Sequence, residues 1–108
     1  MDPNRYQSAL IALNDILKNW STGSQEVVDL FLMKLVETQW RRGCVYKLLM
    51  DSGKNDKQIS EEANNYIDDV VTSVTGFCSL DSIMRFPDEP TESDSILKYV
   101  RGNSWRTK

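Results

Sequence analysis

The side chains best placed to do chemistry in this 108-residue chain are carboxylates that gather between residues 56 and 94. That segment contains ten acidic and two basic side chains, a net charge of −8 within a chain of net charge −3. Residues 1–54 carry +1 and residues 95–108 carry +4. A strongly acidic segment attracts cationic surfaces, and the overall charge argues against nonspecific nucleic-acid binding. The chain has no histidine, which removes His-based catalysis and most zinc sites.

Four of these carboxylates fall on one face of a predicted helix. They form two pairs seven residues apart, nearly two helical turns, with no Lys or Arg among them. Like charges at this density repel one another, so stability alone would favour interspersed lysines. Two interpretations stay open: a solvated helix face that aids solubility, and a docking surface for a basic partner. The face consists of Glu61, Glu62, Asp68 and Asp69, and Asp81 extends it into the next segment.

Catalytic and metal-binding uses of these carboxylates find little support in the spacing. Successive helix residues point about 100° apart, so Asp68 and Asp69 do not converge on one substrate. Residues 51–62 have the length of a calcium-binding EF-hand loop. However, Asp56 stands where that loop needs glycine, and Gly53 supplies no side-chain oxygen. We expect no catalytic residue, no metal and no cofactor.

The remaining reactive and cationic side chains are ordinary for a helical protein. Cys44 and Cys78 lack C-x-x-C spacing and lie among apolar residues, which favours two reduced thiols over a disulfide. Arg41 and Arg42 beside Trp40 are common on a helix flank, so they do not indicate a nucleic-acid site by themselves.

Apolar residues recur at helical spacing through the first half of the chain. Asp2 is expected to cap the first helix, and Ser24 is expected to cap the second. On the second helix, Leu30 and Met33 broaden the apolar stripe, which suggests a helix covered on more than one side. The sequence leaves open whether this helix continues through Gly43 or breaks there, since glycine is unfavourable in a helix interior.

The second half of the chain predicts two further helices. Asp56 or Ser60 caps the third, whose apolar stripe runs to Phe77, with Gly76 as a stop signal. The segment 79–90 contains prolines and has room for one short turn. The last helix is expected to start with Thr91 as its N-cap.

These elements favour an all-α fold, an antiparallel four-helix bundle with or without one extra short helix. We expect residues 1–102 to form one domain and 103–108 to form a loose tail on which Trp105 can dock. The apolar runs are too short to span a membrane, and the start lacks the apolar segment of a secretory signal. A cytoplasmic location is therefore expected.

Several segments together resemble the colicin D immunity family and the related immunity proteins of contact-dependent inhibition systems. The segments are LNDILKNW at 13–20, STGS at 21–24, QEVVDLF at 25–31 and IDDVVTSVTGFC at 67–78. The resemblance spans residues 10–35 and 59–100 through helix length, apolar spacing and an acidic third helix. The stretch 40–57 is longer than the family pattern.

The resemblance implies a helical bundle that binds a tRNA-cleaving toxin domain and covers its basic cleft with acidic side chains that stand in for RNA phosphates. It supplies no catalytic residue. Tyr66 and Phe77 are candidate aromatic anchors for the same contact. We therefore expect a monomeric, non-enzymatic immunity protein that neutralises a basic toxin domain. The matching acidic positions are Glu61, Glu62, Asp68, Asp69 and Asp81.

A different class of function stays open beside this one. The chain can also be a small helical regulator or adaptor, such as an anti-repressor or antitoxin, that binds another protein or forms a homodimer. In that case Leu30 and Met33 would line the contact between copies.

Overall fold

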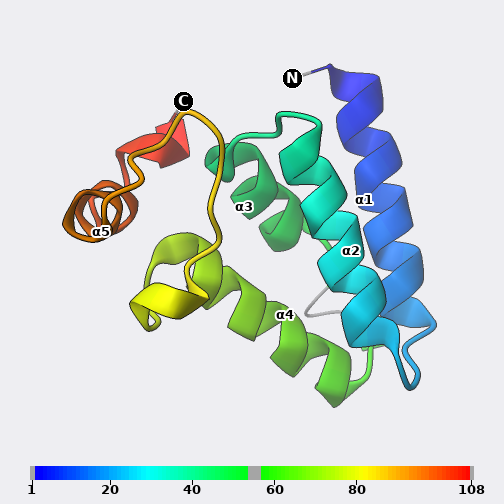
Figure 1. Cartoon of the computed structure of the whole chain (residues 1–108). Helices are drawn as coiled ribbons and strands as arrows, with labels where there is room; N and C mark the ends of the chain where they lie inside the picture. Colours follow the sequence, from blue (N-terminus) through cyan, green and yellow to red (C-terminus); the bar gives the residue numbers. More distant parts are fainter. Residues whose placement is uncertain (1, 54–56, 108) are drawn as a thin grey trace.

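The structure of the protein is a computed structural model that describes residues 2–53 and 57–107 (Figure 1). Within those ranges the chain forms five α-helices, two short 3₁₀ helices and no strand, which confirms the all-α prediction. No helix in the described ranges combines the length and the apolar character needed to cross a bilayer. The elements are α1 (Pro3–Lys18), α2 (Ser24–Glu37), α3 (Arg42–Asp51), α4 (Glu61–Thr75), η1 (Leu80–Ser82), α5 (Ser93–Arg101) and η2 (Ser104–Thr107).

The predicted caps of α1 and α4 are present. The carboxylate of Asp2 accepts a hydrogen bond from the backbone N–H of Asn4 at 3.0 Å. The hydroxyl of Ser60 accepts one from the N–H of Ala63 at 3.2 Å. Each bond satisfies a backbone donor that the first turn of a helix leaves free. The alternative cap, Asp56, lies outside the described residues.

The other two predicted caps are wrong by one position. Ser24 is the first residue of α2, and Gly23 precedes it in the left-handed region with φ of +91°. The Ser24 hydroxyl instead closes the turn between α1 and α2, since it accepts from the N–H of Ser21 at 2.9 Å. Helix α5 is preceded by Glu92, whereas Thr91 was expected there.

The chain breaks into two helices before Gly43. Gln39 adopts the left-handed conformation, with φ of +71°. Its N–H donates to the carbonyl of Val36, and the N–H of Trp40 donates to the carbonyl of Leu35, both at 3.0 Å. This pair of bonds is the Schellman motif, which ends a helix and turns the chain. The C-cap of α2 therefore sets the break, and Gly43 lies in the first turn of α3.

Helix α3 lies at the centre of the packing, in contact with α1, α4 and η2. The connection after α1 brings α2 back antiparallel to it (Figure 1). Buried side chains from α1, α2, α3 and α4 join in one apolar core, with Trp40 from the break between α2 and α3. A smaller core joins α5 to η1. The all-α class is thus shown, and the four-helix bundle stays a prediction.

The end of the chain packs into the core. Trp105 is 2% exposed, and its indole N–H donates to the carbonyl of Val100 at 2.7 Å. The ring of Tyr46 meets it edge-on, with 5.5 Å between ring centroids. The expectation of a loose tail is therefore wrong at Trp105, whereas its expected docking is confirmed.

Arg42 is a buried charge that joins three segments. Its side chain is 1% exposed and forms a two-pronged ion pair with Glu89, with Nη2–Oε1 at 2.9 Å and Nε–Oε2 at 3.1 Å. It also donates to the carbonyls of Val74 and Met84, and its guanidinium lies 4.7 Å from the ring centroid of Phe86. Pairing and hydrogen bonding offset the cost of burying this charge. The guanidinium thereby fixes the segment after η1 against α3 and α4.

Two sequence predictions about apolar faces are wrong. Phe77 follows the end of α4 and is 70% exposed, so it does not continue the buried stripe of that helix. Leu30 and Met33 are 65% and 57% exposed, so α2 is not covered on more than one side by this chain. Both errors arise because helical spacing shows which residues share a face but not which face a neighbour covers.

Candidate protein-binding groove between α2 and α4

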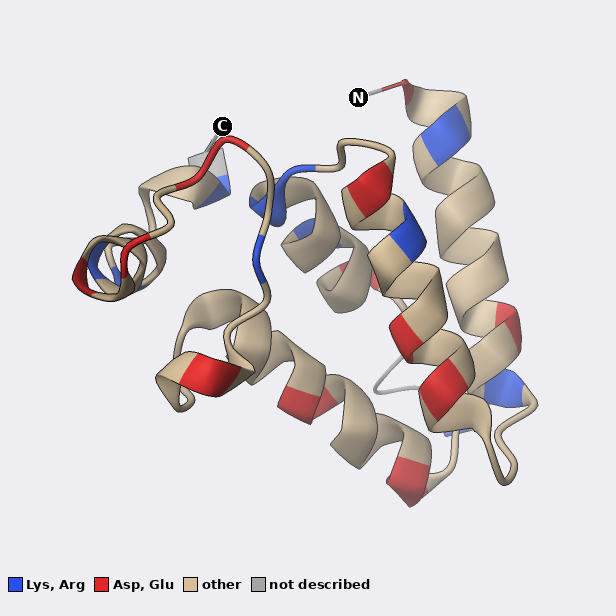
Figure 2. Ribbon diagram, in the orientation of Figure 1, with Lys and Arg blue, Asp and Glu red and all other residues tan. Residues whose placement is uncertain are grey.

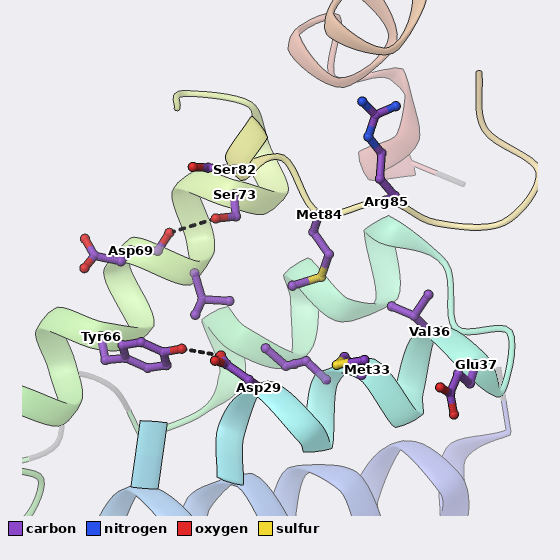
Figure 3. A pocket seen from close by; sticks show the side chains of 12 residues that line it. Asp29, Met33, Val36, Glu37, Tyr66, Asp69, Ser73, Ser82, Met84 and Arg85 are labelled. Carbon is purple, nitrogen blue, oxygen red and sulfur yellow. Dashed lines mark hydrogen bonds between the residues drawn. The ribbon is translucent and has the colours of Figure 1, made fainter. Parts of the chain in front are cut away.

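An open groove with a volume of about 590 Å³ lies between α2 and α4 (Figure 3). Its floor is apolar, and its rim carries polar and charged groups. The segment that follows η1 closes one end. The floor is formed by Leu32, Met33, Val36, Val70 and Met84.

Helix α2 forms one wall of the groove through a single helical face. Asp29, Met33, Val36 and Glu37 follow one another at spacings of four, three and one residues. Positions four and seven residues on from the first fall on the same side of an α-helix. This wall therefore presents two carboxylates on either side of an apolar centre.

Helix α4 forms the second wall in the same way. Tyr66, Asp69, Val70 and Ser73 recur at spacings of three, one and three residues. The Ser73 hydroxyl donates to the carbonyl of Asp69 at 3.4 Å, whereas the Asp69 carboxylate points outward from the floor (Figure 3). The wall thus presents an apolar side chain at its base and a free carboxylate at its edge.

A hydrogen bond between Tyr66 and Asp29 joins the two walls. The phenol of Tyr66 donates to a carboxylate oxygen of Asp29, and Figure 3 shows the two side chains pointing toward each other. Burial raises the pKa of the Tyr66 phenol well above its ordinary value, and the hydrogen bond and negative charge of Asp29 add to the effect. The phenol therefore stays a neutral donor at physiological pH.

The closed end of the groove is held from two sides. The N–H of Met84 donates to the carbonyl of Ser73 in α4 at 3.1 Å, and the carbonyl of Met84 accepts from the buried Arg42. These bonds fix the backbone, so the side chain of Met84 reaches from the loop toward α2 (Figure 3). Arg85, the next residue, stands at the rim and points away from the floor.

The rim is predominantly acidic. Asp29, Glu37 and Asp69 line it with a single cation, Arg85. Among the described residues, none of these three carboxylates forms an ion pair with Lys or Arg. Exposed carboxylates without a Lys or Arg partner, beside an apolar floor, are suited to holding a surface that is both apolar and cationic.

Only part of the acidic surface predicted from sequence lies at this groove, because Glu61 and Asp68 fall on a different side of α4 from Tyr66, Asp69 and Ser73. Figure 2 shows acidic segments on the visible side of α2, α4 and η1. Tyr66 and Asp69 line the groove itself, and Asp81 precedes the lining residue Ser82. All five predicted acidic side chains are exposed: Glu61, Glu62, Asp68, Asp69 and Asp81.

Among the other candidate residues, Glu61, Glu62, Asp68 and Asp81 do not line the groove, and neither does Phe77. Phe77 lies beyond Gly76, where the left-handed turn ends α4 and directs the chain toward η1. Its side chain remains available for contact, but at a separate place from Tyr66.

Sequence reasoning missed most of the α2 wall and all of the closing segment. The signal for Asp29 and Glu37 was available, because they share a helical face with the exposed Met33. No pattern pointed to Met84 and Arg85, because the buried Arg42 that fixes their backbone looks like an ordinary surface arginine in the sequence.

Comparison of the chain with models of protein families, with curated proteins and with solved structures finds no match. Within the described ranges, no cluster of three or more His, Cys, Asp or Glu side chains is arranged to hold a metal ion.

Proposed function

We propose that the protein is a cytoplasmic bacterial immunity protein that neutralises a basic toxin domain, an RNase domain by the family resemblance, by binding it without catalysis. The observation that carries the proposal is the pairing of an apolar groove with an acidic rim. Asp29 and Glu37 on α2 face Asp69 on α4, and no described Lys or Arg pairs with them. A surface that keeps such charges unpaired is ready to accept a cationic partner.

On α4, Glu62 lies on the same side as Asp69 and extends the rim, and Glu61 and Asp68 continue the negative charge around the helix away from the groove. Glu61 and Glu62 lie in the first turn of α4, where the helix dipole favours negative charge, but Asp68 and Asp69 lie beyond that turn. The dipole therefore explains only part of the cluster. Electrostatic complementarity would speed association with a basic cleft and would select against acidic partners.

Charge reversal on α4 tests this proposal. The adjacent reading frame is first searched for a basic toxin domain; the chain is then mixed with that domain, and the affinity is measured by calorimetry. The double variant Glu62→Lys/Asp69→Lys is expected to abolish binding, because it replaces attraction with repulsion. Both side chains are exposed, so the variant should keep its helical circular dichroism.

A control on another helix tests whether reversing any exposed carboxylate weakens binding. Asp15 is an exposed carboxylate on α1 that does not line the groove. We expect Asp15→Lys to bind within about twofold of the wild type, since this carboxylate lies outside the proposed contact and salt screens exposed charges. Unchanged binding by the double variant at moderate salt would mean that the acidic face is only a solvated surface.

A homodimeric regulator or adaptor is a second candidate, favoured by the exposed apolar side chains of α2. Leu30 and Met33 are large, exposed and one turn apart. Light scattering coupled to size exclusion distinguishes the two candidates, because the immunity role predicts a monomer. A dimer that dissociates in Leu30→Lys would favour the regulator.

A further inference from the structure

We infer that the groove between α2 and α4 receives an amphipathic, cationic helix of the partner, with its apolar stripe on the floor and Lys or Arg side chains against the rim. This inference rests on the proposed function, because it names the part of the basic partner that the acidic surface holds. The groove floor and the rim charges together define both faces of such a helix.

The dimensions of the groove fit a short helical segment. The α2 wall runs from Asp29 to Glu37, which at 1.5 Å per residue is about 12 Å, or two turns of a facing helix. Two turns present two or three apolar side chains on one face. The volume of about 590 Å³ between the walls has room for side chains of that number and size.

The walls favour a helix over an extended peptide. Both walls are α-helices, whose backbone groups already bond within each helix. They offer no row of free N–H and C=O groups such as a sheet edge presents to an added strand. An extended peptide on the apolar floor would leave its own backbone groups unpaired, at a large desolvation cost, whereas a helix satisfies them internally.

The floor is built to adapt to the side chains that it meets. Met33 is 57% exposed on α2, and Met84 approaches from the opposite side (Figure 3). Methionine is unbranched and flexible, and it is used where a surface must fit several shapes. Two methionines therefore suit a groove that takes an apolar stripe.

The carboxylates on the rim favour a helix that carries Lys or Arg on both sides of its apolar stripe. Asp29 and Glu37 lie eight residues apart on one wall, with Asp69 on the other. A helix lying between them brings residues from both of its flanks near a carboxylate. Lys and Arg are the side chains that pair with these groups while their aliphatic stems cover apolar surface.

The test uses a model peptide in place of the unidentified partner helix. The peptide has about 18 residues of Leu and Lys, with Leu placed at helical spacing. A control peptide of the same composition alternates Leu and Lys, which is the period of a strand. Binding to the full chain is followed by fluorescence anisotropy, and the helicity gained by the peptide is followed by circular dichroism.

Two variants of α2 form a matched pair. Met33→Lys adds a positive charge to the groove floor, and Val27→Lys adds the same charge to another exposed site on α2, outside the groove. We expect Met33→Lys to weaken binding of the helical peptide at least tenfold and Val27→Lys to change it less than twofold. We also expect the alternating peptide to bind at least tenfold more weakly than the helical one.

Three results would overturn the inference while leaving the toxin-binding proposal to its own test. They are equal effects of the two variants, equal binding of the two peptides, and a wild-type dimer that Met33→Lys converts to a monomer. The toxin-binding proposal can also fail while the helix site stands. Groove-specific binding of the helical peptide by a chain that binds no toxin domain supports the helix site and removes the immunity function.

Discussion

At the scale of single residues, Arg42 governs the position of the groove's closed end. Its guanidinium pairs with the largely buried Glu89 and bonds to the carbonyl of Met84. Replacing one member of a buried ion pair leaves the other charge without compensation. The identity of residue 42 therefore matters for stability far more than that of its exposed neighbour, Arg41.

We predict that Arg42→Met lowers the free energy of unfolding by about 3–5 kcal/mol, as expected when a buried pair is broken. Urea denaturation followed by circular dichroism measures this change. Arg41→Met is the control and should stay within about 0.5 kcal/mol of the wild type. The double variant Arg42→Met/Glu89→Met should be less destabilised than Arg42→Met. If it is not, the unpaired charge is not the cause.

Tyr66 makes stability depend on alkaline pH. Burial, with a further contribution from Asp29, raises the pKa of the folded-state phenol above the value of about 10 that an unfolded chain has. At a pH between the unfolded-state pKa and the folded-state pKa, the Tyr66 phenol keeps its proton in the folded chain and loses it in the unfolded chain. Stability is therefore full below about pH 10 and falls as the pH rises above it.

We predict that the stability advantage of the wild type over Tyr66→Phe is constant below about pH 9 and shrinks as the pH rises through about 10 to about 11. Phenylalanine keeps the ring but has no proton to lose, so other titrating groups cancel in the comparison. Urea denaturation of both proteins at each pH gives the difference. An advantage that stays constant up to about pH 11 would show that the Tyr66–Asp29 bond does not bias the titration.

At the scale of elements, two glycines at helix ends adopt the same left-handed backbone conformation but have different surroundings. Gly76 ends α4 with φ of +84°, and an added Cβ there would lie 2.8 Å from Cγ1 of Val100 in α5. Gly23 has a similar φ of +91°, but an added Cβ there meets nothing within 4 Å. The two glycines thus share a backbone demand and differ in their packing.

We predict that Gly23→Ala costs about 1–2 kcal/mol, the cost of a left-handed residue, and that Gly76→Ala costs about 2–4 kcal/mol, because it adds overpacking against α5. Thermal and urea denaturation of both variants give the comparison. Equal costs would show that α5 moves freely to accept the added methyl group.

The sequence predicted elements better than their contacts. Helical spacing and the caps at Asp2 and Ser60 identified α1 and α4, because these signals are local. The Schellman turn at Gln39 was missed, since a non-glycine residue occupies the left-handed position there. The burial of Arg42 depends on Glu89, 47 residues away, and no local pattern carries that information.

The candidate site was predicted only in part, because local spacing groups residues of one helix but does not show which helices lie side by side. Tyr66 and Asp69 share a face of one helix, so spacing was enough to group them, and they line the groove. The opposite wall at Asp29 and Glu37 is brought there by tertiary packing, since α2 packs against α1, and α1 and α4 both pack against α3. Phe77 was grouped with the stripe of α4, but the turn at Gly76 separates it.

At the scale of the whole molecule, the uneven distribution of charge along the sequence becomes an uneven distribution in space. The acidic segment between residues 56 and 94 supplies α4 and η1, and α2 adds carboxylates from the first half of the chain. These elements surround one groove, so the net charge of −3 understates the field at that place. A cationic partner is therefore expected to bind at this groove.

The most direct test of this account is to search the adjacent reading frame for a basic toxin domain and to measure growth of bacteria that produce it; a neighbouring frame without such a domain would itself count against the account. Co-production of the wild-type chain should restore growth, as should Asp15→Lys, whereas Glu62→Lys/Asp69→Lys should not, although it accumulates to the same level. Restored growth with the double variant, or no protection by the wild type, would contradict the claim that the acidic surface neutralises a toxin.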